Sequence, residues 1–175
     1  ERAATLTAIE SAVKRMTRML DDVLVIGKGD VITNGCNPQP MHLHRWCERL
    51  IREVSEATAV AQGTRPVIRL SAPDDECRLD ETLLHHMVGN LLSNAIKYSP
   101  EGGEVWLRVQ LAPGCVRFEV TDQGIGIQPQ DMKRLFETFY RASNVGQIAG
   151  TGLGLAIVKR AVEQHGGTIG VQSAP

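Results

Sequence analysis

The sequence predicts an α/β (α+β) fold in which helices cover one face of a sheet. Residues 104–111 and 116–121 alternate apolar and polar side chains and are joined by a Pro-Gly pair, a pattern typical of a β-hairpin. Residues 80–98 have the pattern of a helix, with a capping aspartate at its start and a Ser-Pro pair at its end. The mixture of a hairpin with long helices favours this class over an all-helical bundle.

The other elements follow from the same local signals. Apolar periodicity identifies helices, alternation identifies strands, and glycine or proline marks their ends. The expected order is a helix over 41–61, strands over 67–70 and 77–79, helices over 129–136 and 153–165, and a last strand over 168–172.

Residues 1–27 carry an apolar seam of the kind found in helical bundles. Its members alternate at spacings of three and four, the a/d pattern of a coiled coil or four-helix bundle: Leu6, Ile9, Val13, Met16, Leu20 and Val23. The alternative is a lone amphipathic helix packed on its own domain. Glycines and a proline then interrupt the helix, so we expect a helix over 1–28, a linker over 29–39 and a domain over 40–175.

Composition and charge exclude several classes of protein. Hydrophobic residues make up 42% of the chain and charged residues 22%, as in ordinary globular domains. The formal charge is −1 without a basic stripe, so no nucleic-acid partner is expected. The apolar runs are too short to span a bilayer, so we expect a cytoplasmic piece without direct membrane contact. A start at Glu1 rather than Met suggests a fragment of a longer protein, which can itself be membrane-anchored.

Metal and redox chemistry have little support in the sequence. The four cysteines are scattered without a C-x-x-C pair, so reduced thiols are the favoured interpretation. The histidines lack clearly placed cysteine or carboxylate partners, so surface or packing roles are favoured over a metal site.

Three polar residues share one face of the helix expected over 80–98. Asn90, Asn94 and Lys97 lie at positions i, i+4 and i+7. Packing alone explains two such asparagines poorly, because Asn has low helix propensity and burial of an unpaired amide is unfavourable. Amide oxygens suit Mg²⁺ shared with phosphates, and the ammonium would neutralise phosphate charge. The alternative is a polar helix edge without a ligand.

A D-x-G-x-G segment made by Asp122, Gly124 and Gly126 follows the strand expected over 116–121. A carboxylate at a strand end can accept a hydrogen bond from an exocyclic amine, such as that of adenine. The glycines let the chain turn sharply or pass close to a flat ring. By itself the segment is also compatible with many ordinary turns.

Residues 150–155 form a glycine-rich loop before the helix expected over 153–165. Such a loop exposes backbone N–H groups beside the positive end of a helix, a combination that binds phosphate. A Rossmann fingerprint is excluded by the glycine spacing and by the lack of a strand leading directly into the loop. A Walker A loop is excluded because no Gly-Lys-Ser/Thr is present.

Taken together and in this order, the segments resemble the catalytic and ATP-binding domain of sensor histidine kinases. Residues 90–99 are similar to the N box, the D-x-G-x-G segment to the G1 box, 135–141 to the F box and 150–155 to the G2 box. The resemblance runs over about 40–173 and implies the two-layer sandwich shared with Hsp90, gyrase B and MutL.

The resemblance implies ATP and Mg²⁺ as ligands and assigns roles around the phosphates. Asn94 would hold Mg²⁺, and Asn90 would support that site. Lys97 would meet phosphate, and Arg141 would approach the terminal phosphate, which completes the expected catalytic set. The phosphate path would be lined by Gly150, Thr151, Gly152, Leu153, Gly154 and Leu155.

The resemblance also assigns the base end of the nucleotide. Asp122 would read the adenine amino group. The nucleotide pocket would be lined by Tyr98, Gly124, Gly126, Ile127 and Phe139. Residues 141–150 resemble a short ATP lid, whose closure is a familiar gating step.

Residues 1–27 resemble the second helix of the family's two-helix dimerisation hairpin. Two chains would pair such hairpins into a four-helix bundle. The implied partners are therefore a second copy of the chain through residues 1–27, a phosphoacceptor helix and a cognate response regulator. Neither the sensed signal nor the identity of the regulator is encoded in these residues.

Two departures from the family pattern stand out. None of the five histidines is followed by the acidic residue and arginine of the phosphoacceptor box, so the acceptor helix is expected to be missing. The sequence ends at Pro175, before the strand that usually closes the sheet, so a truncated last strand is expected.

The chemistry of the relatives separates kinases from hydrolases. Hsp90, gyrase and MutL activate water with a glutamate one helical turn before the metal-binding asparagine. That position is Asn90 here, and an amide cannot act as a general base. We expect a histidine kinase domain that donates the γ-phosphate to a histidine for relay to a response-regulator aspartate, in a fragment unable to phosphorylate itself. The alternatives are a degenerate kinase domain that acts as a nucleotide-binding scaffold and an ATPase of related fold.

Overall fold

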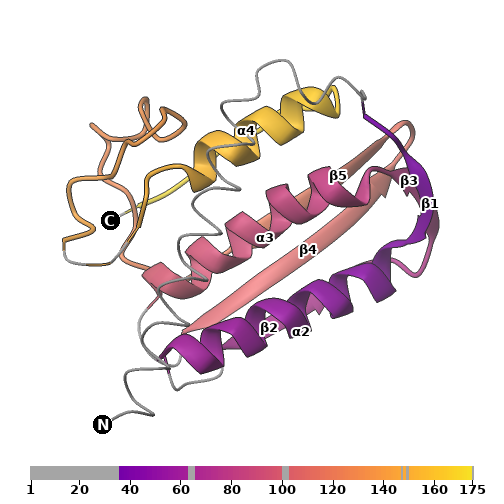
Figure 1. The fold of residues 1–175 in the computed structure, drawn as a ribbon, viewed down its shortest axis with the longest axis horizontal. Helices are drawn as coiled ribbons and strands as arrows, with labels where there is room; N and C mark the ends of the chain where they lie inside the picture. Colours follow the sequence, from indigo (N-terminus) through magenta and orange to yellow (C-terminus); the bar gives the residue numbers. More distant parts are fainter. Residues whose placement is uncertain (1–35, 63–65, 100–102, 147, 149, 175) are drawn as a thin grey trace, which may run out of the picture.

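The computed structural model describes residues 36–62, 66–99, 103–146, 148 and 150–174 (Figure 1). The helix expected over 1–28 and the linker up to residue 35 lie outside these residues. The elements in chain order are β1 (Gln39–His42), α2 (Leu43–Gln62), β2 (Val67–Ser71), β3 (Glu76–Leu79), α3 (Glu81–Tyr98), β4 (Glu104–Ala112), β5 (Cys115–Thr121) and α4 (Gly154–Gln164).

The main sheet has the strand order β2-β4-β5 and confirms the predicted hairpin and the strand before it. β4 pairs in parallel with β2 and antiparallel with β5. Val105, Leu107 and Val109 of β4 are buried on one face. On the other face the register sets Arg108 opposite Glu119, and their side chains form an ion pair at 3.4 Å. A sheet with one apolar and one charged face needs a single covering layer.

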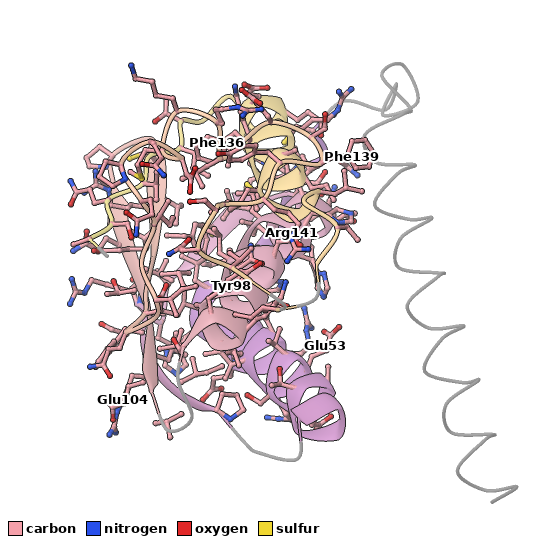
Figure 2. The ribbon with its side chains drawn as sticks, turned by 90° about the vertical axis from the view of Figure 1, so that its left-hand side faces the viewer. Glu53, Tyr98, Glu104, Phe136, Phe139 and Arg141 are labelled. Atoms are coloured by element: carbon pink, nitrogen blue, oxygen red, sulfur yellow. The ribbon has the colours of Figure 1, made fainter. Side chains whose placement is uncertain are left out.

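Helices provide that layer on the apolar face (Figure 2). α2 contacts β2, α3 contacts β4 and β5, and α4 packs beside α3. α3 buries Leu84 and Leu92 in the core, and Trp46 of α2 meets Phe118 of β5 edge-on with ring centroids 6.3 Å apart. The predicted one-sided helical cover is confirmed. No described helix has both the length and the apolar character needed to cross a bilayer.

A separate two-stranded sheet joins β1 to β3 in antiparallel register. β3 confirms the short strand expected over 77–79, whereas β1 occupies the start of the helix expected from residue 41. Pro40 lies within β1 opposite Arg78. Proline lacks an N–H and is tolerated in strands only at edges, and both strands of this two-stranded sheet are edges.

Two expected elements are wrong. Residues 129–136 form successive turns in place of a helix, with hydrogen bonds from Asp131 N to Gln128 O at 2.9 Å and from Arg134 N to Asp131 O at 3.0 Å. Each of these bonds spans three residues, so no α-helical ladder develops. Residues 168–172 have the composition of a strand but no partner strand among the described residues, and a strand needs a ladder to form.

The start of α3 is tied to the end of α4 through Asp80 and His165. The Asp80 carboxylate caps α3 by accepting the Leu83 N–H at 3.0 Å, and it also accepts the Asn37 N–H at 2.9 Å. The Asp80 N–H donates to His165 Nε2 at 3.2 Å. Partial burial raises the pKa of Asp80, but the backbone hydrogen bonds and His165 outweigh it, so the pKa lies below its ordinary value.

His165 is held in its neutral form by this arrangement. Because Nε2 accepts the hydrogen bond, the ring proton is on Nδ1, which is buried without a hydrogen-bond partner. Burial lowers the pKa of His165, and the Asp80 charge opposes that shift only in part.

We expect the free energy of unfolding to fall as the pH drops below about 6.5, because the unfolded chain then binds a proton that folded His165 resists. The loss stops growing once the pH passes the lowered native pKa. His165→Gln keeps an acceptor for the Asp80 N–H but cannot titrate. Denaturant unfolding between about pH 7.5 and 5 should therefore show a flatter curve for the variant. An identical slope in both proteins would exclude His165 as the cause.

Candidate functional site

The polar face of α3 carries Asn90, Asn94 and Lys97, all half-buried. Asn90 Nδ2 donates to the His86 carbonyl at 2.8 Å, which orients its Oδ1 away from the helix backbone. Lys97 Nζ donates to the Tyr98 hydroxyl at 3.0 Å and lies 4.6 Å from the Tyr98 ring centroid. One helix face therefore presents amide groups and a positioned ammonium within two turns.

The glycine loop before α4 lies against this face. A Cβ built on Gly154 would be 3.1 Å from Asn90 Oδ1 and 3.7 Å from Asn94 Nδ2. A Cβ built on Gly150 would be 2.6 Å from Lys97 Nζ. The absence of side chains at these two glycines lets the loop lie directly against the α3 side chains.

The N-terminus of α4 also faces this region. Its N-cap residue, Leu153, makes no side-chain capping hydrogen bond, so the helix start lacks the usual Ser, Thr or Asp cap. Thr151 Oγ1 accepts the Leu153 N–H at 3.3 Å, and the Leu153 side chain itself is buried in the core. A helix N-terminus beside a lysine and glycine backbone amides has the chemistry of an anion site.

Gly152 is the most constrained position of the loop. Its φ is +73°, and a Cβ there would lie 2.6 Å from the Phe139 carbonyl carbon and 2.8 Å from the Tyr140 carbonyl oxygen. The Phe139 N–H donates to the Gly152 carbonyl at 2.9 Å. The loop is therefore locked, backbone to backbone, to the segment that precedes Arg141.

The D-x-G-x-G segment packs on the last turn of α3. The Ile125 N–H donates to the Tyr98 carbonyl at 3.1 Å, and a Cβ on Gly124 would lie 2.8 Å from that same oxygen. Asp122 is exposed, and its Oδ1 accepts the Gly124 N–H at 2.8 Å. Gly126 has a φ of +66°, a conformation that glycine adopts without strain. The two glycines thus explain the spacing that the sequence shows.

Side chains of the expected lid form hydrogen bonds to the D-x-G-x-G segment and to backbone carbonyls within the lid itself. Asn144 Nδ2 donates to the Gly126 carbonyl at 2.9 Å. The Arg141 guanidinium donates to the carbonyls of Gly146 and Ile148. Figure 2 shows Tyr98 and Arg141 on the helical side of the sheet.

Two further expected site residues contact other segments through their backbones. Phe139 is 70% exposed, has a φ of +63° and points outward at the edge of the molecule (Figure 2). The Ile127 N–H donates to Ser173 Oγ at 3.0 Å, which ties its backbone to the C-terminal segment. Of the other expected residues, Gly124, Gly150 and Gly154 lie directly against the C-terminal half of α3, Arg141 bonds within the lid, and Leu153 is buried.

One residue of the site region was not expected from the sequence. Asp131 is 4% exposed and accepts hydrogen bonds from Tyr140 and Ser143. Its sequence pattern predicts a helix, and nothing in that pattern indicates that the Asp131 carboxylate would bind residues 140 and 143. A separate shallow depression at the start of α3, lined by Glu81, Thr82, His85 and His86, touches none of the motif segments.

The described residues contain no group of three or more His, Cys, Asp or Glu side chains that could hold a metal ion. The site is instead built from amides, hydroxyls, a lysine and backbone N–H groups. Such a donor set suits an ion that brings most of its oxygen ligands with it, as Mg²⁺ does when bound to phosphates.

Comparison with known proteins agrees with this geometry. Residues 79–175 match the family described as histidine kinase-, DNA gyrase B- and HSP90-like ATPase. The chain is 34% identical over 172 residues to the sensor protein IrlS of Burkholderia pseudomallei (strain K96243), covering 95% of this chain and 36% of IrlS. It therefore spans about a third of the length of this curated relative.

Solved structures show the same fold. The mycobacterial sensor histidine kinase MprB aligns with a TM-score of 0.63 and 34% identity, covering 73% of this chain and 82% of that chain. Full-length ShkA in complex with AMPPNP aligns with a TM-score of 0.66 and 29% identity, covering 93% of this chain and 34% of that chain. The chain belongs to the histidine kinase-, DNA gyrase B- and HSP90-like ATPase family, as the catalytic ATP-binding domain of a two-component sensor histidine kinase.

Proposed function

We propose that this chain binds Mg·ATP at the C-terminal half of α3 and donates the terminal phosphate to a histidine of a partner helix, for relay to a response regulator. The observation that carries the proposal is the convergence of two motif segments on the polar face of α3, which carries the third motif. The D-x-G-x-G segment meets the Tyr98 carbonyl, and the glycine loop meets Asn90 and Lys97.

The base end of the nucleotide is assigned to Asp122. One carboxylate oxygen is already occupied by the Gly124 N–H, which fixes the side chain. The second oxygen would accept a hydrogen bond from the adenine amino group. Tyr98, Gly124 and Gly126 would form the wall of the pocket around the base.

The phosphates are assigned to the space between α3 and the glycine loop. Lys97 would neutralise phosphate charge, and backbone N–H groups at the start of α4 would bind phosphate oxygens. Asn90 Oδ1 faces Gly154 at the loop, so an amide oxygen is available beside the phosphate path. Asn94 would hold Mg²⁺ with support from Asn90, and the ion would neutralise charge on the phosphates.

Arg141 is assigned to the terminal phosphate. Its guanidinium now donates to neutral backbone carbonyls of Gly146 and Ile148. Phosphate oxygens are stronger acceptors for a guanidinium than carbonyls, so bound ATP can displace these contacts. The exposed position of Arg141 allows this exchange without opening the core.

The chemistry favours phosphotransfer over hydrolysis. The amide of Asn90, bound to the His86 carbonyl, cannot activate water as a general base. A neutral imidazole is already a nucleophile, and a loose phosphoryl transition state mainly needs positioning and charge neutralisation. The likeness to the AMPPNP complex of ShkA supports a nucleotide at this site.

Residues 1–27 are assigned to a dimerisation helix that pairs with a second copy. The alignment with IrlS covers 95% of the chain, so it must include most of residues 1–35. The apolar seam of this segment suits a four-helix bundle, whose other helix would carry the phosphoacceptor histidine.

The proposal is tested by phosphotransfer in trans. The chain is mixed with radiolabelled ATP, with and without a hairpin from the same natural protein that carries a phosphoacceptor histidine. We expect label only on the hairpin, stable to base and lost in acid. Asp122→Ala should reduce the label through weaker ATP binding. Labelling of the chain alone would contradict its role as donor, and ATP binding without transfer would favour the scaffold alternative.

The glycine loop provides a matched pair of variants. Gly152→Ala places a Cβ against backbone atoms at a φ of +73°, so the loop must shift. Gly150→Ala meets side-chain atoms alone: the Lys97 ammonium at 2.6 Å, which can move aside, and the Tyr98 hydroxyl at 3.6 Å. We expect the first variant to weaken Mg·ATP binding at least tenfold, or about 1.4 kcal/mol, and the second by less than about threefold. Equal losses in calorimetric titration would show that the loop does not depend on Gly152.

A further inference from the structure

Asp131 is the buried charged residue of the described part of the chain, and it lies outside the family motifs discussed above. Its Oδ1 accepts the Tyr140 hydroxyl at 2.7 Å. Its Oδ2 accepts both the Ser143 N–H at 2.8 Å and the Ser143 hydroxyl at 2.9 Å. The hydrogen bond from Tyr140, followed by those from Ser143, holds the pKa of Asp131 below its ordinary value. A carboxylate therefore accepts three hydrogen bonds in a site with little solvent.

The three hydrogen bonds bracket Arg141. Tyr140 precedes it and Ser143 follows it by two residues, so both flanks of the arginine are fixed to one carboxylate. The preceding backbone is fixed a second time, because Gly152 packs directly on Phe139 and Tyr140. Asp131 and the glycine loop thus hold the same short segment from two sides.

The aromatic ring of Tyr140 strengthens this anchor. The Arg134 guanidinium lies 4.2 Å from the ring centroid, and Arg134 in turn forms an ion pair with Glu137 at 2.9 Å. Cation–π contact with an exposed arginine is worth roughly a hydrogen bond. Tyr140 is therefore held at both its hydroxyl and its ring. The neighbouring Arg141 side chain is exposed and bonds only to carbonyls of the lid, so it can move while the backbone beside it stays fixed.

We infer that Asp131 is a positioning residue for nucleotide discrimination: it fixes the segment 140–143 so that Arg141 can reach the terminal phosphate of ATP. This inference rests on the proposed function, because it needs a triphosphate bound between α3 and the glycine loop. It adds a residue that contacts no nucleotide and acts through Arg141. Its consequence is a preference for ATP over ADP, since only ATP carries the phosphate that Arg141 would meet.

The test measures the affinities of the complete 175-residue chain for Mg·ATP and Mg·ADP by calorimetry. Asp131→Asn keeps the size of the side chain but replaces one accepting oxygen with a donor that faces Tyr140 or Ser143. We expect the ratio of ATP to ADP affinity to fall about tenfold, with ADP affinity changed less than about threefold. Asp75→Asn removes the same charge at an exposed position in the connection between β2 and β3 and should leave the ratio unchanged.

A rescue variant separates positioning from simple loss of stability. Ser143→Asp alone sets two carboxylates against each other and should also lower the ratio. In the double variant Asp131→Asn with Ser143→Asp, the new amide can donate to the new carboxylate while its oxygen still accepts from Tyr140, although the N–H of residue 143 loses its acceptor. The ratio should then recover in part, above that of either single variant, whatever the melting temperature of the variants.

The outcomes are distinguishable. An Asp131→Asn chain with the wild-type ratio overturns the inference, as does a wild-type chain that binds ATP no tighter than ADP. A double variant that stays as impaired as the two single variants also overturns it, because the effect would then not pass through this contact. A chain that binds neither nucleotide contradicts the proposed function itself, and the inference falls with it.

Discussion

The site depends on the close approach of glycine backbone to α3 and to the segment before Arg141. Gly124 brings one loop onto the Tyr98 carbonyl, and Gly154 brings the start of α4 onto Asn90. Gly152 then locks the same loop to Phe139 and Tyr140. A side chain at any of these positions would meet an atom within about 3 Å, closer than ordinary van der Waals contact allows. Without these contacts the polar face of α3 would have no loops to complete it.

The helix that receives these loops has two distinct faces. Leu84, Leu92 and Ala95 pack into the core above the sheet, which fixes the position of α3. Asn90 and Lys97 stay half-buried on the other face, where their polar groups find partners in His86 and Tyr98. The packed apolar face thus holds α3 rigid, although the polar residues on its other face contribute little to packing. A rigid element that carries the polar groups of a site keeps them in place without further reorganisation.

Much of the fold followed from sequence patterns because the signals were local. The hairpin and the helix ending at Tyr98 were predicted by alternation, capping and turn residues, and they are confirmed. β1 was missed because its residues fell between an expected linker and an expected helix, and the partner strand that defines it lies far along the chain in β3. The helix expected over 129–136 is replaced by turns, in which the Asp131 carboxylate accepts hydrogen bonds from Tyr140 and Ser143, nine and twelve residues along the chain. Such long-range contacts leave no periodic trace in the sequence.

In the site, too, some features have a local sequence signal and others depend on contacts between distant segments. The spacing of Asn90, Asn94 and Lys97 predicted one shared face, and the glycine spacings predicted close backbone approach. Nothing local placed Asp131 beside the lid or turned Phe139 outward, because both depend on how the turn region meets the glycine loop. Motif residues can be read from the chain, whereas the residues that hold the motifs in position emerge only from the three-dimensional contacts.

The most direct test of the account is backbone amide hydrogen exchange with and without Mg·AMPPNP. We expect slower exchange in residues 122–127 and 150–156, which meet the C-terminal half of α3, and in residues 139–146, which contact Gly126 and Gly152. We expect no change in β1, β3 or the start of α3 near Glu81, which lie away from the motif segments. Protection confined to that distant region, or binding without protection of the glycine loop, would contradict the account.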